Sequence, residues 1–319
     1  MDPSDFTVGW IAAVHPELAA AQAMLDEEYN ASDLTKHLRD TNSYSLGRIG
    51  VHNIALTCLP TIGNNAAGSV ANHMRNTFAN LRFGLMVGIG GGVPSREPRL
   101  RLGDVVVSKP SGTHSGVIKY DSGKFIQNGE FVVTGALPFP DKELLSAATH
   151  LRAKHERFDN SITHYINEMF LKHPKMAQTG YKCPGTEHDR LFRAGYVHRG
   201  DGDTCAACDK RQTVSRPDRN EDQPVTFYGN IASGNAVMRD AEKRDQLGKQ
   251  HDALCFEMEA AGLMDVFPCL IVRGICDYSD SHKNKDWQRY AAATAAAYAK
   301  ELLGEVYVGG MFADQNLPP

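Results

Sequence analysis

The chain has 319 residues, of which 42% are hydrophobic and 23% charged, and its formal net charge is −4. This length accommodates one large α/β domain or two smaller ones. The near-neutral charge gives no electrostatic case for binding nucleic acid or an anionic membrane surface. No apolar run approaches the roughly 20 residues that span a bilayer. We therefore expect neither nucleic acid nor a membrane as a partner.

The N-terminal segment and the cysteines indicate the compartment. Residues 1–5 are acidic and lack the basic and apolar regions of a signal peptide. The seven cysteines are an odd number, and Cys58, Cys255, Cys269 and Cys276 lie in apolar runs, as buried thiols do. We expect a reducing, cytoplasmic location.

Strands and helices alternate through the first half of the chain. Pro16 suits a first helical turn, so the strand at 6–14 is expected to lead into a helix that ends near residue 28. The further expected elements are strands at 44–50, 52–59, 85–89 and 102–108, a loop at 61–65, and helices at 66–78 and 142–154.

The second half contains a segment of different composition. Residues 157–224 are rich in His, Asp, Arg, Pro and Gly, which indicates a large, partly looped insertion rather than an independent domain. The elements expected after it are strands at 225–232 and 270–276 and helices at 241–250, 257–266 and 287–303, the last capped by Asp286. Residues 309–319 are expected to form a mobile tail.

This alternation predicts an α/β fold with three αβα layers and a central mixed, mostly parallel twisted sheet. We expect a single domain over residues 1–308, interrupted by the insertion.

Three carboxylates are candidates for chemistry. A buried strand ends at Asp277, which places this carboxylate at the sheet edge where open α/β sheets bind ligands. Glu259 lies upstream among apolar neighbours, and Glu17 follows the first strand. A single glutamate is usually a surface or first-turn residue. Together the three predict a proton donor, a group that holds hydroxyls and a base for water.

The glycine run at 88–92 follows a strand and lets the backbone approach a flat or anionic ligand. Its spacing matches neither the glycine fingerprint of dinucleotide-binding folds nor the phosphate-binding loop of nucleoside triphosphatases.

Six segments resemble the nucleoside phosphorylase superfamily, in the family's order and with compatible spacing. Within it they are most similar to the methylthioadenosine/S-adenosylhomocysteine nucleosidase type and to fungal-type nucleosidase domains, which are often fused to nucleotide-binding and repeat modules. Here the domain is expected to stand alone. The segments are residues 9–17, 61–68, 87–92 with 102–108, 231–235, 256–260 and 272–277. The resemblance covers most of the chain except 157–224.

The resemblance implies a role for each acid. Asp277 would protonate N7 of a departing purine, Glu259 would hold the ribose hydroxyls, and Glu17 would activate water. The other substrate-binding residues that it implies are Ile89, Gly90 and Gly91 beside the base, Val237 and Met238 against the purine, Met258 under the sugar, and Asn235 in place of an acid common at that site.

The implied activity is purine N-ribosyl hydrolysis, with adenine preferred because Asp277 stands where 6-oxopurine enzymes often carry asparagine. Two alternatives remain open: a phosphorylase that uses phosphate, and a non-catalytic nucleoside or nucleotide sensor. The resemblance implies no cofactor, a small-molecule purine ligand and a homo-oligomer, with a dimer as the first expectation. Residues that could bind a phosphate or nucleotide anion are Arg96, Arg99, Arg101, Lys119, Tyr120 and Lys124.

The insertion contains the pair Cys205 and Cys208, with Cys183, His188 and His198 nearby. Such a set could form a structural zinc site. A single C-x-x-C without a second pair is a weak signal, so the sequence favours free thiols and no metal.

Overall fold

The computed structural model describes residues 2–200, 204–217, 219 and 223–307, and the tail expected at 309–319 lies outside these residues. One central sheet carries the fold, with its strands in the order β11, β10, β6, β12, β5, β1, β4, β3, β2, and with β7 paired to β10. The strand bounds in that order are Ala253–Glu257, Thr226–Ser233, Val105–Ser108, Cys269–Asp277, Phe83–Gly92, Val8–Ala12, His52–Cys58, Tyr44–Ile49, Glu27–Tyr29 and Val117–Lys119.

The sheet is mixed, as expected, and its centre is parallel. β1 runs parallel to β4 and β5, and β5 runs parallel to β12. β6 runs antiparallel to β12 but parallel to β10. β11 also pairs antiparallel with the glycine end of β5, at Gly91 and Gly92, so the sheet curls toward itself at this point.

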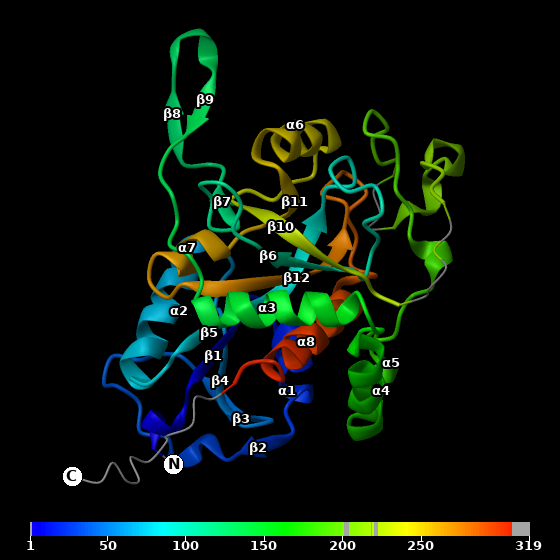
Figure 1. Ribbon diagram of the computed structural model, residues 1–319. Coiled ribbons are helices and arrows are strands. Elements are labelled where there is room, and N and C mark those ends of the chain that lie inside the picture. Colours follow the sequence, from blue (N-terminus) through cyan, green and yellow to red (C-terminus); the bar gives the residue numbers. More distant parts are fainter. Residues whose placement is uncertain (1, 201–203, 218, 220–222, 308–319) are drawn as a thin grey trace, which may run out of the picture.

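Helices cover both faces of the sheet and give three layers (Figure 1). One face carries α1 (His15–Ala23), α3 (Lys142–His155), α4 (Ile162–Lys172) and α8 (Gln288–Leu303), whose buried side chains share one core cluster. The other face carries α2 (Asn64–Thr77) and α7 (Ala260–Met264) in a second cluster. The remaining helices are α5 (Pro174–Gln178) and α6 (Ala241–His251), and α6 contacts β10 and β11.

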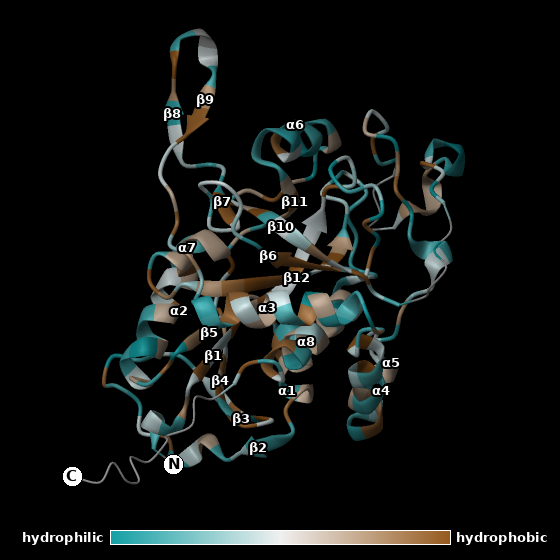
Figure 2. Ribbon diagram, viewed as in Figure 1, coloured by the Kyte–Doolittle hydropathy of each residue, from teal (hydrophilic) through white to brown (hydrophobic). Residues whose placement is uncertain are grey.

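Apolar residues concentrate in the central strands, of which β6 and β12 are the most hydrophobic in colour (Figure 2). The alanine-rich α8 packs so closely on β12 that a side chain at Gly274 would overlap the backbone of Ala291. The hairpin of β8 (Gly123–Phe125) and β9 (Phe131–Val133) projects from the domain (Figure 1).

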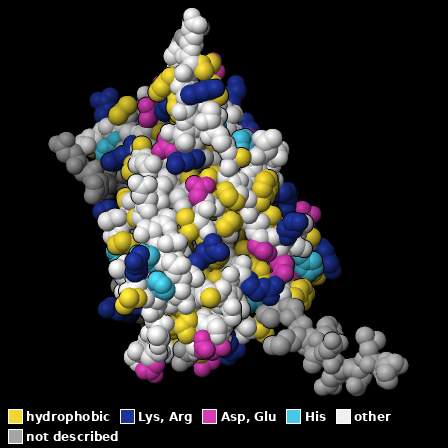
Figure 3. All heavy atoms as spheres, turned by 90° about the vertical axis from the view of Figure 1, so that its left-hand side faces the viewer, with side chains coloured by type: hydrophobic (Ala, Val, Ile, Leu, Met, Phe, Trp, Pro, Cys, Tyr) yellow, Lys and Arg dark blue, Asp and Glu magenta, His cyan; other side chains and the backbone are white. Residues whose placement is uncertain are grey.

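On the face shown in Figure 3, lysines and arginines are interspersed with acidic side chains. None of the helices in the described part of the chain has the length and apolar character of a membrane span.

Several predicted elements differ from the structure. The helix expected at 257–266 is wrong in its first residues, because Ala253–Glu257 forms β11 and the helix begins only at Ala260. The Glu257 carboxylate accepts hydrogen bonds from the backbone N–H groups of Glu259 and Ala260, which fixes the start of the helix after it.

Other boundaries shift for local reasons. The helix expected to end near residue 28 ends at Ala23, because residues 27–29 pair with β3. The strand expected from residue 102 begins at Val105, since Gly103 has a positive φ of 89° and turns the chain. Asp286 does not cap α8, whose N-cap is Trp287.

Candidate active site

The carboxyl ends of the parallel strands and the loops that follow them enclose a cavity of about 140 Å³. Strand β5 forms its floor, and β11, β12 and the start of α1 contribute its walls. The lining residues are Ala13, Val14, Glu17, Ile62, Ile89, Gly90, Gly91, Ala236, Val237, Met238, Phe256, Glu257, Met258, Glu259, Cys276, Ser279 and Lys283. This is the sheet edge at which open α/β folds bind their ligands.

Glu17 is fixed at the start of α1, directly after β1. Its Oε2 accepts hydrogen bonds from the backbone N–H groups of Ala13 (2.6 Å) and Val14 (3.1 Å). Its Oε1 accepts one from the N–H of Ile89 on β5 (2.7 Å). Burial raises the pKa of Glu17 above its usual value, although Arg273 and these donors act in the opposite direction. A carboxylate that is held this firmly and has a raised pKa is suited to accept a proton.

Arg273 lies beneath the cavity as a fully buried cation on β12. Its Nη2 is 2.5 Å from Oε2 of Glu257 and 3.8 Å from Oε2 of Glu259. Glu17, Glu257 and Glu259 all act electrostatically on this guanidinium. One buried arginine is thus the shared cationic partner of three buried glutamates.

Glu259 follows β11 and is held by weak backbone contacts. The N–H of Gly63, before α2, lies 3.3 Å from its Oε1, and the N–H of Met258 lies 3.3 Å from its Oε2. Burial and the nearby Glu257 raise the pKa of Glu259 to about 7, against the effect of Arg273. Glu259 lines the cavity, where its carboxylate can accept hydrogen bonds from hydroxyl groups.

Asp277 ends β12, which pairs with one edge of β5, whereas β1, the strand before Glu17, pairs with the other edge. Its Oδ2 lies 2.9 Å from Nζ of Lys283, and its Oδ1 accepts a hydrogen bond from the N–H of Ser279 (2.8 Å). Ser279 has a positive φ of 52°, a rare conformation for this residue type that occurs at functional sites.

Gly91 makes room for this acid. A side-chain carbon at Gly91 would lie 2.6 Å from Oδ1 of Asp277, so a residue with a Cβ would displace the carboxylate. The triple glycine therefore brings the floor of the cavity and the acid together.

The walls above the floor are apolar. They consist of Ile62, Val237, Met238, Phe256 and Met258. Tyr120 packs edge-on against Phe256 with ring centroids 5.4 Å apart, and its hydroxyl donates to the carbonyl of Ala236 (3.3 Å). Such walls suit a flat aromatic ligand.

The structure brings most of the predicted site residues together. Those that line the cavity are Glu17, Ile89, Gly90, Gly91, Val237, Met238, Met258 and Glu259. Asp277 lies against the lining through Gly91, Ser279 and Lys283. Asn235 is not among the lining residues, because its side chain bonds Asn64 and Asp121.

The arginines considered for anion binding lie elsewhere. Arg96 pairs with Asp252, and Arg99 pairs with Glu97. Arg101 donates to the carbonyl of Pro217 (2.7 Å). Lys124 is exposed on the projecting hairpin, in β8.

Sequence reasoning missed the roles of Arg273, Glu257 and Lys283. An arginine inside an otherwise apolar strand is a usable signal, because a buried guanidinium requires a carboxylate partner. The sequence carries no comparable signal for Lys283, since its contact with Asp277 depends on the conformation of the intervening turn.

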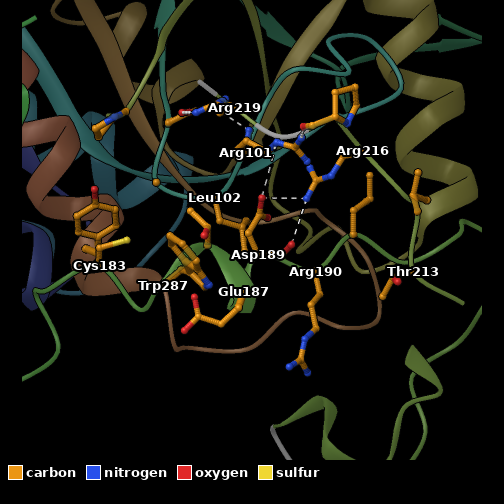
Figure 4. Close-up of a pocket in the computed structure, with 18 of the residues that line it drawn as sticks. Arg101, Leu102, Cys183, Glu187, Asp189, Arg190, Thr213, Arg216, Arg219 and Trp287 are labelled. Atoms are coloured by element: carbon orange, nitrogen blue, oxygen red, sulfur yellow. Dashed lines mark hydrogen bonds and ion pairs between the residues drawn. The ribbon is translucent and has the colours of Figure 1, made fainter. Parts of the chain in front are cut away.

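A second, larger hollow of about 620 Å³ lies at the base of the insertion. There Arg216 contacts Asp189 at 2.9 Å, with Arg101 and Arg219 close by (Figure 4). The Arg216 guanidinium and the Asp189 carboxylate also hydrogen-bond the hydroxyl of Tyr278 (2.7 and 2.5 Å), the residue after Asp277. The insertion therefore holds the segment that follows Asp277.

Comparison with known proteins gives matches over most of the chain. No protein-family model matches. A nucleotide-binding leucine-rich repeat (NLR)-like protein of Hyaloscypha variabilis is 45% identical over 301 residues, which are 94% of this chain and 29% of that protein. The ATP nucleosidase Cap17 of Escherichia coli is 26% identical over 249 residues, 76% of this chain and 39% of that protein. The chain thus spans well under half the length of these two curated relatives.

A solved structure also matches over nearly the whole chain. The Helicobacter pylori 5′-methylthioadenosine/S-adenosyl homocysteine nucleosidase has a TM-score of 0.57 and 15% identity, and the match covers 95% of this chain and 99% of that one. The resemblance predicted from the six sequence segments is confirmed, since the chain has the fold of this nucleosidase.

Proposed function

We propose that the chain is an N-ribosyl hydrolase that releases a purine base, with adenine preferred, from a nucleoside or nucleotide. The observation that carries this proposal is the meeting of three acids at one cavity. Glu17 is anchored at Ile89, Asp277 lies against Gly91, and Glu259 faces the cavity beside them. Two residues of strand span roughly 7 Å, so one small ligand can contact both ends of this floor.

Each acid has a step in the reaction. Water attacks C1′ of the ribose while the C1′–N9 bond breaks, Glu17 accepts the proton of the water, and Asp277 donates a proton to N7 of the base. Glu259 accepts hydrogen bonds from the ribose hydroxyls and holds the sugar as positive charge develops on it. Lys283 fixes the Asp277 carboxyl group through Oδ2.

The charges of the described lining residues favour hydrolysis over phosphorolysis. Among the described residues that line the cavity, Lys283 is the only lysine or arginine, and it is paired with Asp277. A phosphate co-substrate would need an unpaired cation. The position and hydrogen bonds of Glu17 supply what a water nucleophile needs instead.

The charges of the lining residues also bear on the 5′ group of the substrate. Without an unpaired cation in the described lining, a nucleoside with a neutral 5′ group is the substrate class that the cavity favours. The similarity to a protein named ATP nucleosidase supports ATP as the competing candidate. Both belong in the first assay.

The test is chromatography of phosphate-free reactions with adenosine, methylthioadenosine, inosine, guanosine, AMP and ATP. We expect adenine to appear without phosphate. The variants Asp277→Asn and Glu17→Gln should each lose about 10²–10⁴-fold in rate, because each removes one proton-transfer group. The matched control is Glu156→Gln. This side chain is 72% exposed and is not among the residues that line the cavity, so the variant should keep the wild-type rate.

Two results would contradict the proposal. Base release that depends on added phosphate would identify a phosphorylase. Purine binding with no base released under either condition would identify a sensor.

A further inference from the structure

The insertion brings three metal-binding side chains together. One donor atom each from His198, Cys205 and Cys208 lies within 4.8 Å of the other two. A 3₁₀ turn at Cys205–Ala207, closed by the bond from the N–H of Cys208 to the carbonyl of Cys205 (3.2 Å), brings the two cysteines to the same side. Both cysteines are free thiols in the structure.

The spacing is close to that of a zinc centre. With Zn–S near 2.3 Å and Zn–N near 2.0 Å, the ligand atoms of a tetrahedral site lie roughly 3.5–3.8 Å apart. A contraction of about 1 Å or less would therefore complete three of the four bonds. Cys183 and His188, which the sequence placed near this set, are exposed and do not belong to the group.

A fourth donor lies beside the group. The ring of His282 is edge-on to that of His198, with centroids 5.6 Å apart, and its carbonyl lies 3.7 Å from Sγ of Cys205. The side chain is buried against Phe192, with ring centroids 3.9 Å apart. Neither ring nitrogen has a hydrogen-bond partner among the described residues, and Nδ1 lies 3.7 Å from Oδ1 of Asp280. An imidazole buried without a hydrogen bond is costly, and a metal ion would satisfy one nitrogen.

The backbone around the thiols supports the same conclusion. The N–H of Arg199 points at Sγ of Cys208 over 3.5 Å, a contact that favours a thiolate ligand.

We propose that His198, Cys205, Cys208 and His282 bind a structural zinc ion. The first three residues are already gathered, and the imidazole of His282 turns toward them to complete the tetrahedron. The two sulfurs and two nitrogens form the ligand set that zinc accepts in closed structural sites.

The site would join the insertion to the segment that carries the proposed acid. His282 lies five residues after Asp277, and the N–H of His198 already bonds Oγ of Ser281 (3.0 Å). The zinc would add to the attachments of the insertion to residues 278–283 that are already present, which are this bond and the contact of Asp189 and Arg216 with Tyr278. Its role is therefore to fix this turn and, through Lys283, the position of Asp277.

The experiment is metal analysis of the chain purified under reducing conditions, with cobalt(II) as a spectroscopic replacement. We expect about one zinc ion per chain. Cobalt(II) should give the thiolate charge-transfer bands and intense visible bands of a tetrahedral site. A strong chelator should lower the melting temperature of the metal-loaded protein.

Variants locate the ligands. Cys205→Ser and Cys208→Ser should lose the metal, His282→Ala should lose it to a chelator faster than the wild type, and Cys183→Ser should behave as the wild type because this thiol lies outside the group. The cobalt spectrum and the chelator effect on the wild type do not depend on any variant folding.

Three results would overturn the inference: wild-type protein that contains no zinc and binds none when zinc is added, a disulfide between Cys205 and Cys208 in the reduced preparation, or zinc retained by both serine variants. Metal content is measured without substrate, so its outcome is independent of whether the chain releases a purine base.

Discussion

The buried cation Arg273 offers the sharpest test of how the site is held together. The substitution Arg273→Met keeps an unbranched apolar stem and removes the charge. It leaves Glu17, Glu257 and Glu259 without their shared partner. At 3.8 Å and an effective dielectric of about 20, the gross attraction between unit charges is about 4 kcal/mol.

The net loss is limited, because the carboxylates left without their partner can take up protons. Removing one member of a buried ion pair typically costs about 3–5 kcal/mol. With an unfolding entropy of about 2.1 cal/mol/K per residue, 319 residues convert this loss to a fall in melting temperature of about 4–8 °C. The loss should be larger at pH 8 than at pH 5, since ionised carboxylates need the arginine and protonated ones do not.

The assay is thermal and guanidinium unfolding followed by circular dichroism at both pH values. The double variant Arg273→Met with Glu257→Gln should recover a large part of the loss, because an uncharged replacement of a buried pair is often nearly neutral. The matched control is Arg99→Met, whose side chain is 79% exposed in its pair with Glu97 and which should change stability by less than about 1 kcal/mol. A loss below about 1 kcal/mol at pH 8, or one that does not change with pH, would refute this account of the site.

Two further predictions concern Glu259 and the floor of the cavity. Because the pKa of Glu259 is about 7 in the folded chain and near 4.5 when unfolded, the folded state retains a proton between these values and stability falls as pH rises through this window. Glu259→Gln should remove on the order of 1–3 kcal/mol of that fall, measured as the difference in unfolding free energy between pH 4.5 and 7.5, and an unchanged pH slope would contradict the assignment. Gly88→Ala should lower kcat about 10²-fold in a folded protein, because the added carbon meets the Glu17 carboxylate and the Arg273 guanidinium. Gly195→Ala is the control, because a Cβ there would meet only Oε1 of Glu242 at an ordinary contact distance of 3.9 Å, and equal rates in the two variants would rule out the close packing at Gly88.

The sequence predicts the parts of this site that end strands. Asp277 follows an apolar run and Glu17 follows the first strand, and both lie at the cavity edge as expected. These positions are predictable because a buried parallel strand has a recognisable composition and because strand ends converge at one edge.

The parts that the sequence does not predict depend on tertiary pairing. Residues 253–257 have the apolar character of either a strand or a helix, and their pairing with β10 and β5 decides for the strand. The contact of Lys283 with Asp277 depends on the left-handed conformation of Ser279, which its sequence neighbours do not require. Likewise, a C-x-x-C pair alone favours free thiols, and only the fold brings His198 and His282 beside it.

Strand β12 connects both halves of the proposed chemistry. It carries Arg273, which balances the acids on the ribose side, and four residues later it ends in Asp277 on the base side. The cation lowers the pKa of Glu17 and Glu259, while burial acts in the opposite direction and keeps the pKa of each above its usual value. A base needs this balance, because a carboxylate with too low a pKa accepts a proton poorly and one with too high a pKa is already protonated. The buried arginine is therefore as much a part of the proposed catalytic arrangement as the acids that contact the substrate.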